Sequence, residues 1–195
     1  MPTLEYIRIS KEKKLLLLGI SEEGERSRYT VGESFYISVG SPASGSVLSD
    51  SLFDSIKQED LRIRATSKAL SILSYADNNE RSLVNKLVRA GFPRELSQTV
   101  AEEMTGHGYI DEERQLRRLI LKEANTNLSG YSKFLPKLVS KGYSAEMIKT
   151  VTSSLIGEGE IDFKENAKRL IEKRLPADAS VTEKKTLLYR NGYKV

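Results

Sequence analysis

Leu87-Val-Arg-Ala-Gly91-Phe92 contains a pattern, Leu-x-x-x-Gly followed by an aromatic residue, that returns twice further along the chain. It recurs as Leu138-Val-Ser-Lys-Gly142-Tyr143 and as Leu188-Tyr-Arg-Asn-Gly192-Tyr193, at intervals of 51 and 50 residues. Residues 86–111 and 137–162, aligned at the first interval, are identical at 11 of 26 positions. A repeat of this length indicates one supersecondary unit that is copied along an axis, each copy burying its apolar face against its neighbours. The sequence therefore predicts a binding surface rather than an enzyme pocket.

The composition is that of a globular protein with one sizeable domain or two small ones. The chain has 195 residues, of which 38% are hydrophobic and 30% charged. Cysteine is absent, which excludes disulfides, thiolate metal sites and a cysteine nucleophile and is typical of a reducing cytoplasm. The apolar run Leu15–Leu18 is too short to span a bilayer, and the first residues lack a basic segment. We therefore expect a cytoplasmic protein with no signal peptide and no membrane contact.

Residues 1–59 are predicted to form a small β-rich module. Apolar residues alternate there as they do in strands, and glycines separate the runs. A flexible loop is expected at Gly40–Ser51, followed by a short helix near Ser51–Gln58. We expect the sheet to be antiparallel. Because so small a sheet is marginal by itself, we also expect it to pack on the helices that follow. The four strand-like runs are Tyr6 to Ile9, Leu15–Ile20, Tyr29 with Val31, and Phe35 with Ile37 and Val39.

From Asp60 onward the apolar period becomes helical, so the fold class is mainly α. Three tandem three-helix repeats are predicted, over residues 60–107, 108–158 and 159–195. The third begins at Ile161, and its second helix opens with a capping box, Ser180-Val-Thr-Glu183. Its last helix is missing, so either this unit is incomplete or the sequence is cut short. The helices expected in the first two repeats are Leu61–Tyr75, Glu80–Ala90, Pro93 to Gly106, Asp111–Ala124, Ser129–Lys141 and Ser144–Ile156. The buried stripe of the first is predicted to contain Ala65, Ala69, Leu70, Ile72, Leu73 and Ala76.

The net charge of +4 is unevenly distributed. Residues 1–59 carry 7 Lys and Arg against 9 Asp and Glu, whereas residues 60–195 carry 24 against 18. A basic face attracts polyanions or acidic protein surfaces, although lysines and arginines can equally be the solvated face of a helix. Three basic groups are candidate contacts with a partner or with DNA. The first is a helical stripe of Arg114, Arg118 and Lys122 beside Arg117, the second is Lys86, Arg89, Lys133, Lys137 and Lys141, and the third is Lys164, Lys168, Arg169, Lys173 and Arg174.

Each basic group has a simpler interpretation that stays open. The stripe lies on a helix whose first turn is acidic and whose second half is basic, as the helix dipole favours. In the third group, Glu165 and Glu172 dilute the positive charge.

Signals of catalysis are weak. His107 is the only histidine, so a histidine-based metal site or catalytic triad has no second member. No phosphate-binding loop of the type Gly-x-x-x-x-Gly-Lys-(Ser/Thr) is present. We therefore predict a protein that is not an enzyme and that needs no metal or cofactor.

Aromatic residues recur in the repeats. We expect them to pack in the core and between repeats, and base stacking is the alternative. They are Tyr75, Phe92, Tyr109, Phe134, Tyr143 and Phe163.

The stretches Ala69–Tyr75, Glu80–Gly91 and Gly108–Arg114, together with Gly130 and Leu138–Gly142, resemble the RecX family, regulators of the bacterial recombinase RecA. The resemblance covers the chain from about Ala69 to its end. It implies three tandem three-helix units in an elongated, curved array. It also implies binding along the RecA–DNA filament and modulation, usually inhibition, of filament assembly, ATPase and strand exchange in DNA repair and the SOS response. The chain departs from the family pattern at Ala76, Asn78, Asp111-Glu112 and Gln115-Leu116.

Two functions of different class follow. The favoured one is a monomeric regulator whose partner is the RecA nucleoprotein filament. The alternative is a stand-alone DNA-binding helical repeat module, whose affinity for bare single- or double-stranded DNA would fall steeply with salt. The modest net charge favours the first. A structural adaptor for an unrelated partner is a third possibility.

Overall fold

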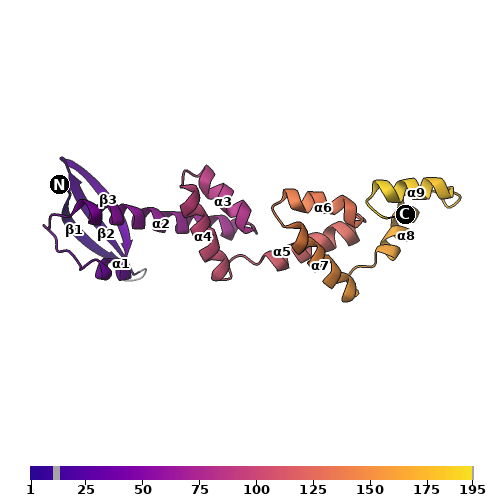
Figure 1. The fold of residues 1–195 in the computed structure, drawn as a ribbon, viewed down its shortest axis with the longest axis horizontal. Helices are drawn as coiled ribbons and strands as arrows, with labels where there is room; N and C mark the ends of the chain where they lie inside the picture. The colour runs from indigo at the N-terminus through magenta and orange to yellow at the C-terminus, as the bar shows by residue number, and fades with distance from the viewer. Residues whose placement is uncertain (11–13, 195) are drawn as a thin grey trace. The chain divides into compact units, whose positions relative to one another are not determined.

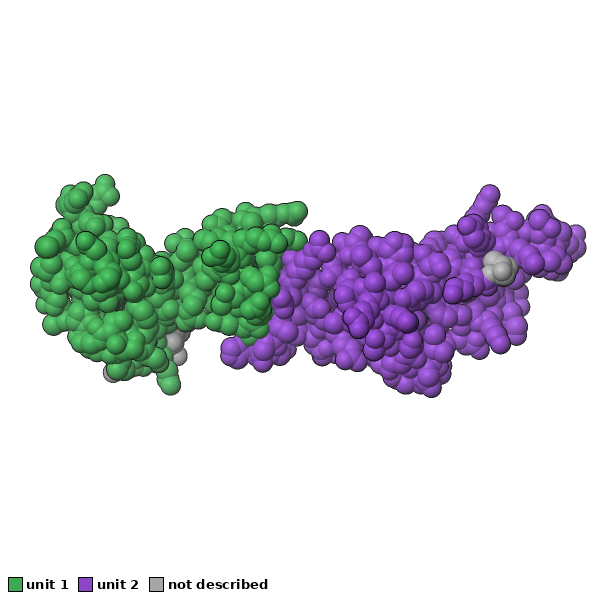
Figure 2. All heavy atoms as spheres, viewed as in Figure 1, with its two compact units in different colours: residues 1–75, 84–104 green, residues 76–83, 105–195 purple. Residues whose placement is uncertain are grey.

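The computed structural model describes residues 1–10 and 14–194 and contains two compact units. Unit 1 contains residues 1–75 and 84–104, and unit 2 contains residues 76–83 together with those from 105 onward (Figure 2). Figure 1 follows the chain from the N-terminal sheet through the helices. These two compact units do not coincide with the predicted β module and three repeats. That division therefore stays a prediction.

The sheet of unit 1 is a three-stranded antiparallel meander, as predicted. Strands β1 (Thr3–Ser10), β2 (Leu15–Glu22) and β3 (Glu25–Gly32) are paired in the order β1-β2-β3. Residues of alternate positions on β2 enter the core, and Leu16, Leu18 and Ile20 are buried there. The hairpin between β2 and β3 has a two-residue turn, Glu23-Gly24, in which both φ angles are positive (51° and 87°). This left-handed pair matches the twist of the two strands.

The expected fourth strand at Phe35 to Val39 is wrong, because these residues lie in and after a short helix, α1 (Glu33–Ser38). The extended residue Gly32 precedes the helix, and Phe35 and Tyr36 pack on the core of the sheet. Ile37 points outward and is 64% exposed. Three alternating apolar residues fit one turn of helix as well as a short strand, which explains the error.

A single helix, α2 (Asp50–Tyr75), covers both the short helix and the first repeat helix that were expected separately. No glycine or proline interrupts these 26 residues, so nothing in the sequence ends the helix near residue 59. The first half of α2 packs on β3, and Figure 1 shows that α2 continues beyond the sheet. The carboxylate of Asp60 accepts a 2.8 Å hydrogen bond from the Thr30 amide, which helps to fix the helix on this edge strand.

The predicted buried stripe of α2 is confirmed only in part. Ala65 and Ala69 are fully buried, and Ile72 and Leu73 are half-buried. Leu70 and Ala76, in contrast, are exposed, because the buried side of the helix is narrow here and is lined by alanines.

The three Leu-x-x-x-Gly-aromatic motifs form the same helix end. In the first, which ends α3 (Glu80–Arg89) before α4 (Arg94–Gly106), the Phe92 amide donates to the Leu87 carbonyl and the Gly91 amide donates to the Val88 carbonyl. Gly91 has a φ of 94°, the left-handed conformation that this pair of bonds requires. The second and third motifs have equivalent bonds, Tyr143 to Leu138 and Tyr193 to Leu188. The repeat in the sequence is therefore a repeat of Schellman helix ends.

Unit 2 contains the second and third repeats. Helices α5 (Glu112–Leu121), α6 (Tyr131–Ser140) and α7 (Ala145–Gly157) enclose a core that includes Leu116, Ile120, Phe134, Leu138 and Ile148. The helix expected over Asp111–Ala124 ends earlier, because its last turn widens into a π-helical segment, η1 (Lys122–Thr126). Helices α8 (Phe163–Arg174) and α9 (Val181–Arg190) follow, and α9 begins with the predicted capping box of Ser180 and Glu183.

The recurring aromatic residues do not share one environment. Phe134 and Tyr143 are buried, which confirms their predicted packing, and Phe92 and Phe163 are half-buried. Tyr75 is 92% exposed and Tyr109 is 58% exposed, so the prediction that they pack inward is wrong. Tyr75 is the last residue of α2, and next to Tyr109 it is Ile110 that is buried. Among the described residues, no helix is long and apolar enough to cross a membrane.

Candidate functional site

A cavity of about 400 Å³ in unit 2 brings part of the predicted basic surface together. It lies between the loop that precedes α3, helix α5 and the turn that joins α6 to α7. Its cations are Arg118, Lys122 and Lys141, and Asp77 is the carboxylate among its lining residues. The cavity is therefore open, polar and mainly positive.

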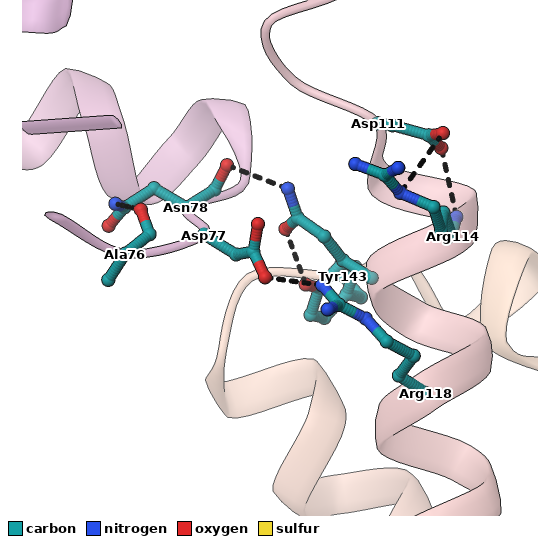
Figure 3. Close-up of polar contacts among 8 residues, drawn as sticks. Ala76, Asp77, Asn78, Asp111, Arg114, Arg118 and Tyr143 are labelled. Atoms are coloured by element: carbon teal, nitrogen blue, oxygen red, sulfur yellow. Dashed lines mark hydrogen bonds and ion pairs between the residues drawn. The ribbon is translucent and has the colours of Figure 1, made fainter. Parts of the chain in front are cut away.

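A buried chain of hydrogen bonds forms the floor of this cavity. The Tyr143 hydroxyl donates to Oε1 of Gln115 (3.2 Å), and Nε2 of Gln115 donates to the Asn78 carbonyl (3.2 Å), as Figure 3 shows. Burial, together with the negative charge of Glu112 and Asp77, raises the pKa of the Tyr143 hydroxyl above its ordinary value. The hydroxyl therefore stays a proton donor to Gln115 at neutral pH.

The loop before α3 is held in place by further bonds. Oδ1 of Asn79 accepts from the Ser82 amide (2.9 Å) and so caps α3, while Nδ2 of Asn79 donates to the Lys141 carbonyl (2.9 Å). The carboxylate of Glu112, in the first turn of α5, accepts from the Glu80 amide (2.8 Å). Each bond satisfies a main-chain donor or acceptor at a helix end. The cavity wall is thus fixed to α5 and to the α6–α7 turn.

The stripe Arg114, Arg118 and Lys122 lies on α5 and the start of η1, opposite the buried Leu116 and Ile120. Asp111 caps α5 by accepting from the Arg114 amide (2.9 Å), and the Arg114 Nε lies 3.7 Å from its carboxylate. Arg118 forms an ion pair with Asp77 (Figure 3). The side chains of Arg114 and Arg118 nevertheless remain 71% and 58% exposed, so both can meet a partner.

Arg117 differs from the rest of the first group. Its guanidinium donates to the Glu158 carboxylate that follows α7, with 3.1 Å between Nη1 and Oε1, and its side chain is 30% exposed. The hydrogen bonds from Arg117 and Ser154 hold the pKa of Glu158 at about 2, below its ordinary value of 4.5. Arg117 thus stabilises the second repeat internally.

The second basic group is divided. Lys86 and Arg89 belong to unit 1, whereas Lys133, Lys137 and Lys141 belong to unit 2. Lys137 forms an ion pair with Glu123, and Nζ of Lys133 donates to the Asn191 side chain (2.6 Å). Burial opposes ionisation of Glu123, but the hydrogen bonds from Lys137 and Asn127 outweigh it and hold the pKa of Glu123 below its ordinary value. Only Lys141 of this group lines the cavity.

The third group lies on one helix, α8. Nζ of Lys168 is 3.5 Å from the Glu165 carboxylate, and Nη1 of Arg169 donates to the Asn166 side chain (3.3 Å). The members, all of which are exposed, are Lys164, Lys168, Arg169, Lys173 and Arg174.

Residues that the sequence did not indicate complete the site. Asp77 and Asn79 belong to a cluster, Asp77-Asn78-Asn79, that is typical of a turn and helix cap, and for Tyr143 the sequence favours packing over base stacking. The one local signal was Gln115, a polar residue next to the buried stripe of an amphipathic helix. Its partners Asn78 and Tyr143 are 37 and 28 positions away, too far for a local pattern to reveal.

The chain is similar to known RecX proteins. No protein-family model matches it. Over 130 residues it is 26% identical to regulatory protein RecX of Clostridioides difficile (strain 630), an alignment that covers 67% of this chain and 59% of that protein. The chain thus matches less than two thirds of the length of this relative.

Two solved structures have the same fold. A crystal structure of regulatory protein RecX superimposes with a TM-score of 0.75 at 22% identity, over 100% of this chain and 95% of the other. A crystal structure of RecX from Lactobacillus salivarius superimposes with a TM-score of 0.56 at 16% identity, over 69% and 90%. Along with the sequence similarity and the three equivalent helix ends, this shared fold supports membership of the RecX family.

Proposed function

We propose that this protein regulates a RecA recombinase, as an inhibitor that binds along the RecA–DNA filament through the exposed side of α5. The relatives described above are regulatory proteins. The observation that carries the proposal is the position of Arg118 on α5 and Lys122 at the start of η1, both at the edge of a fixed, polar cavity. A protein partner with an acidic surface fits such an arrangement.

The ion pairs of α5 favour a protein partner over bare DNA. Arg114 and Arg118 each have a carboxylate beside them, which weakens the field that would attract phosphates. Exposed pairs of this kind contribute only about 0–1 kcal/mol to stability. A carboxylate of the partner can therefore replace Asp77 at Arg118 at small cost, and Lys122 adds a further cation.

Regulation requires that the protein binds one state of the filament better than another, because a ligand shifts an equilibrium only by its differential affinity. Binding across neighbouring protomers, or at a filament end where the next protomer would add, would both satisfy this condition. In either case the effect on ATP turnover would act through the ATPase of RecA.

The test is the steady-state ATPase of the cognate RecA on single-stranded DNA, titrated with this protein. We expect turnover to fall at sub-stoichiometric ratios. The triple variant Arg114→Glu, Arg118→Glu, Lys122→Glu should need roughly tenfold more protein for the same effect, about 1.4 kcal/mol of binding free energy. The matched control is Lys68→Glu, which reverses an exposed charge on α2 and should leave the titration unchanged.

An unchanged turnover would contradict the proposal. If the protein then bound bare DNA with a steep salt dependence, the chain would be a DNA-binding repeat module instead. Circular dichroism of the triple variant excludes loss of folding as the cause of a weak effect.

A further inference from the structure

The sheet of unit 1 has two unlike faces. On one face, Leu16, Leu18 and Ile20 of β2 point into the core, and the helices that contact the sheet, α1 and α2, pack on this side. Because alternate residues of a strand point to opposite faces, the positions between them form a second, outer face. The strand register places six residues together on it, and they are Tyr6 and Arg8 of β1, Leu17 and Gly19 of β2, and Arg26 and Arg28 of β3.

An aromatic ring lies directly over the middle strand of this outer face. A Cβ at Gly19 would be 2.1 Å from Cε1 of Tyr6, so the ring occupies the space that any other residue at position 19 would fill. The guanidinium carbon of Arg8 lies over the same ring, 5.2 Å from its centroid. The glycine backbone, the tyrosine ring and the guanidinium thus form three layers, and Arg8, the outermost, is exposed.

The outer face is positive although the module as a whole is not. Residues 1–59 carry 7 Lys and Arg against 9 Asp and Glu, yet among the described strand residues that reach this face Glu5 has the one carboxylate. It accepts a 3.1 Å hydrogen bond from Nε of Arg26, whose side chain remains 79% exposed. Arg28 is exposed as well, and its position two residues further on places the two Cα atoms roughly 7 Å apart. The face therefore offers a row of cations beside the layered stack.

A single-stranded nucleic acid matches both features. Its phosphates pair with arginines, and its unstacked bases have free faces that stack on aromatic rings and on guanidinium planes. In a duplex those faces are covered by the neighbouring bases, and an acidic protein surface has carboxylates but no bases. The layered stack of Tyr6 and Arg8 therefore favours a single strand over other polyanions.

We propose that the outer face of the sheet binds single-stranded nucleic acid, with backbone phosphates on Arg26 and Arg28 and a base on the guanidinium of Arg8 above the Tyr6 ring. Such contacts carry little sequence preference, because every base has a flat face and every nucleotide has a phosphate. The site goes beyond the proposed function and does not depend on it, since the cations of α5 belong to unit 2.

The experiment is fluorescence anisotropy of the full chain with a labelled oligothymidylate of about ten nucleotides, a length within the usual range of such sites. An abasic oligomer of the same length should bind roughly fivefold more weakly or worse, since it keeps the phosphates but has no base to stack. An oligoglutamate of equal charge should bind more weakly for the same reason. An oligouridylate is the RNA arm, and the tighter of the two nucleic acids identifies which one the face takes.

Variants assign the binding to this face. Arg28→Gln should weaken binding and reduce the slope of log K against log salt by about 0.7, the contribution of one phosphate contact on a single strand. Arg8→Lys keeps the charge but loses the planar guanidinium, so the affinity should fall several-fold with the slope unchanged. Tyr6→Leu should have the same effect, because it removes the ring that supports Arg8. The matched control Lys68→Gln, which removes an exposed cation from α2, should leave the affinity within about twofold.

Because Arg8 and Arg28 are exposed, their variants should fold normally, and circular dichroism checks Tyr6→Leu. Four results would overturn the proposal. They are no binding of the oligothymidylate, equal binding of the abasic oligomer, equal binding of the oligoglutamate, and binding that Arg28→Gln and Arg8→Lys leave unchanged.

The triple variant of α5 separates this site from the helical repeats. With Arg114→Glu, Arg118→Glu and Lys122→Glu together, the affinity for the oligothymidylate should stay within about threefold of the parent value. Loss of binding in this variant, with Arg28→Gln unaffected, would assign nucleic-acid binding to the repeats and overturn the proposal. The RecA titration is a separate readout, so either proposal can fail without the other.

Discussion

The side-chain amide of Asn79 donates a 2.9 Å hydrogen bond to the main-chain carbonyl of Lys141, which lies 62 positions further along the chain. One repeat later, the main-chain amide of Gly130 donates in the same way to the carbonyl of Asn191 (2.7 Å). Each bond joins the start of one repeat's second helix to the Leu-x-x-x-Gly-aromatic turn of the next repeat. The motif that defines the repeat in the sequence is thus also its docking element within unit 2.

The close approach at the second of these junctions predicts that Gly130 tolerates no side chain. A Cβ at Gly130 would lie 2.6 Å from the main-chain nitrogen of Tyr193, on backbone that cannot move aside independently. We expect Gly130→Ala to lower the free energy of unfolding by about 1–3 kcal/mol, the usual cost of overpacking.

Urea denaturation of Gly130→Ala measures this loss, and Gly157→Ala serves as its control. A Cβ at Gly157, the last residue of α7, would meet no atom within 4 Å, and alanine favours the helix. Equal stabilities of the two variants would show that the turn of the third repeat does not dock at Gly130.

The floor of the candidate site leads to a prediction about Tyr143. Tyr143→Phe leaves the buried Gln115 without a donor to its Oε1, so we expect a loss of about 1–3 kcal/mol. The control Tyr189→Phe, at a tyrosine that is 78% exposed, should be close to neutral. Thermal or urea unfolding at neutral pH measures both.

A double-mutant cycle separates this hydrogen bond from general packing. Once Gln115→Leu has removed the acceptor, Tyr143→Phe should cost less than it does in the parent chain, and the difference is the coupling between the two side chains. Strict additivity would mean that the Tyr143 hydroxyl and Gln115 do not interact.

Much of the fold could be predicted from the sequence because its main signals are local. The Schellman ends at Gly91, Gly142 and Gly192 each depend on a glycine and the residues just before it, and the capping box of Ser180 depends on four consecutive residues. The apolar run Leu15–Ile20 likewise predicted a strand. Patterns of this kind are independent of what the rest of the chain does.

The remaining features depend on contacts between distant residues. Phe35 lies in a helix and packs against the core of the sheet. Tyr109 is exposed, whereas its neighbour Ile110 is buried. The candidate site needed Asp77, Asn78 and Tyr143 beside α5, and no spacing rule brings these positions together. For the same reason the sequence identified the cations of α5 but not Asp77, the distant carboxylate that pairs with Arg118.

The ion pair of Arg117 and Glu158 predicts a dependence of stability on acid. The pKa of Glu158 is held at about 2, mainly by the hydrogen bond from Arg117, whereas its ordinary value is 4.5. A lowered pKa means that the pair contributes its full stability above pH 4.5 and loses it as the pH falls through about 2. We expect stability to decrease over this window.

NMR titration of the Glu158 carboxyl carbon measures the midpoint directly. It should lie near 2 in the parent chain and move toward 4.5 in Arg117→Gln, and Glu158→Gln should flatten the acid side of the stability curve. A parent midpoint near 4.5 would show that the pair does not form in solution.

A charge exchange at Arg118 and Asp77 distinguishes a role in binding from a role in folding. Arg118→Glu places two carboxylates beside each other, and the added change Asp77→Arg restores an ion pair of opposite direction. Because the pair is more than half exposed, we expect each step to change stability by no more than about 1 kcal/mol. If a partner contacts the cation on α5, as proposed, both the single and the exchanged variant should inhibit the RecA ATPase less than the parent does. Recovery of full inhibition in the exchanged variant would assign Arg118 a structural role, since the pair alone would then suffice.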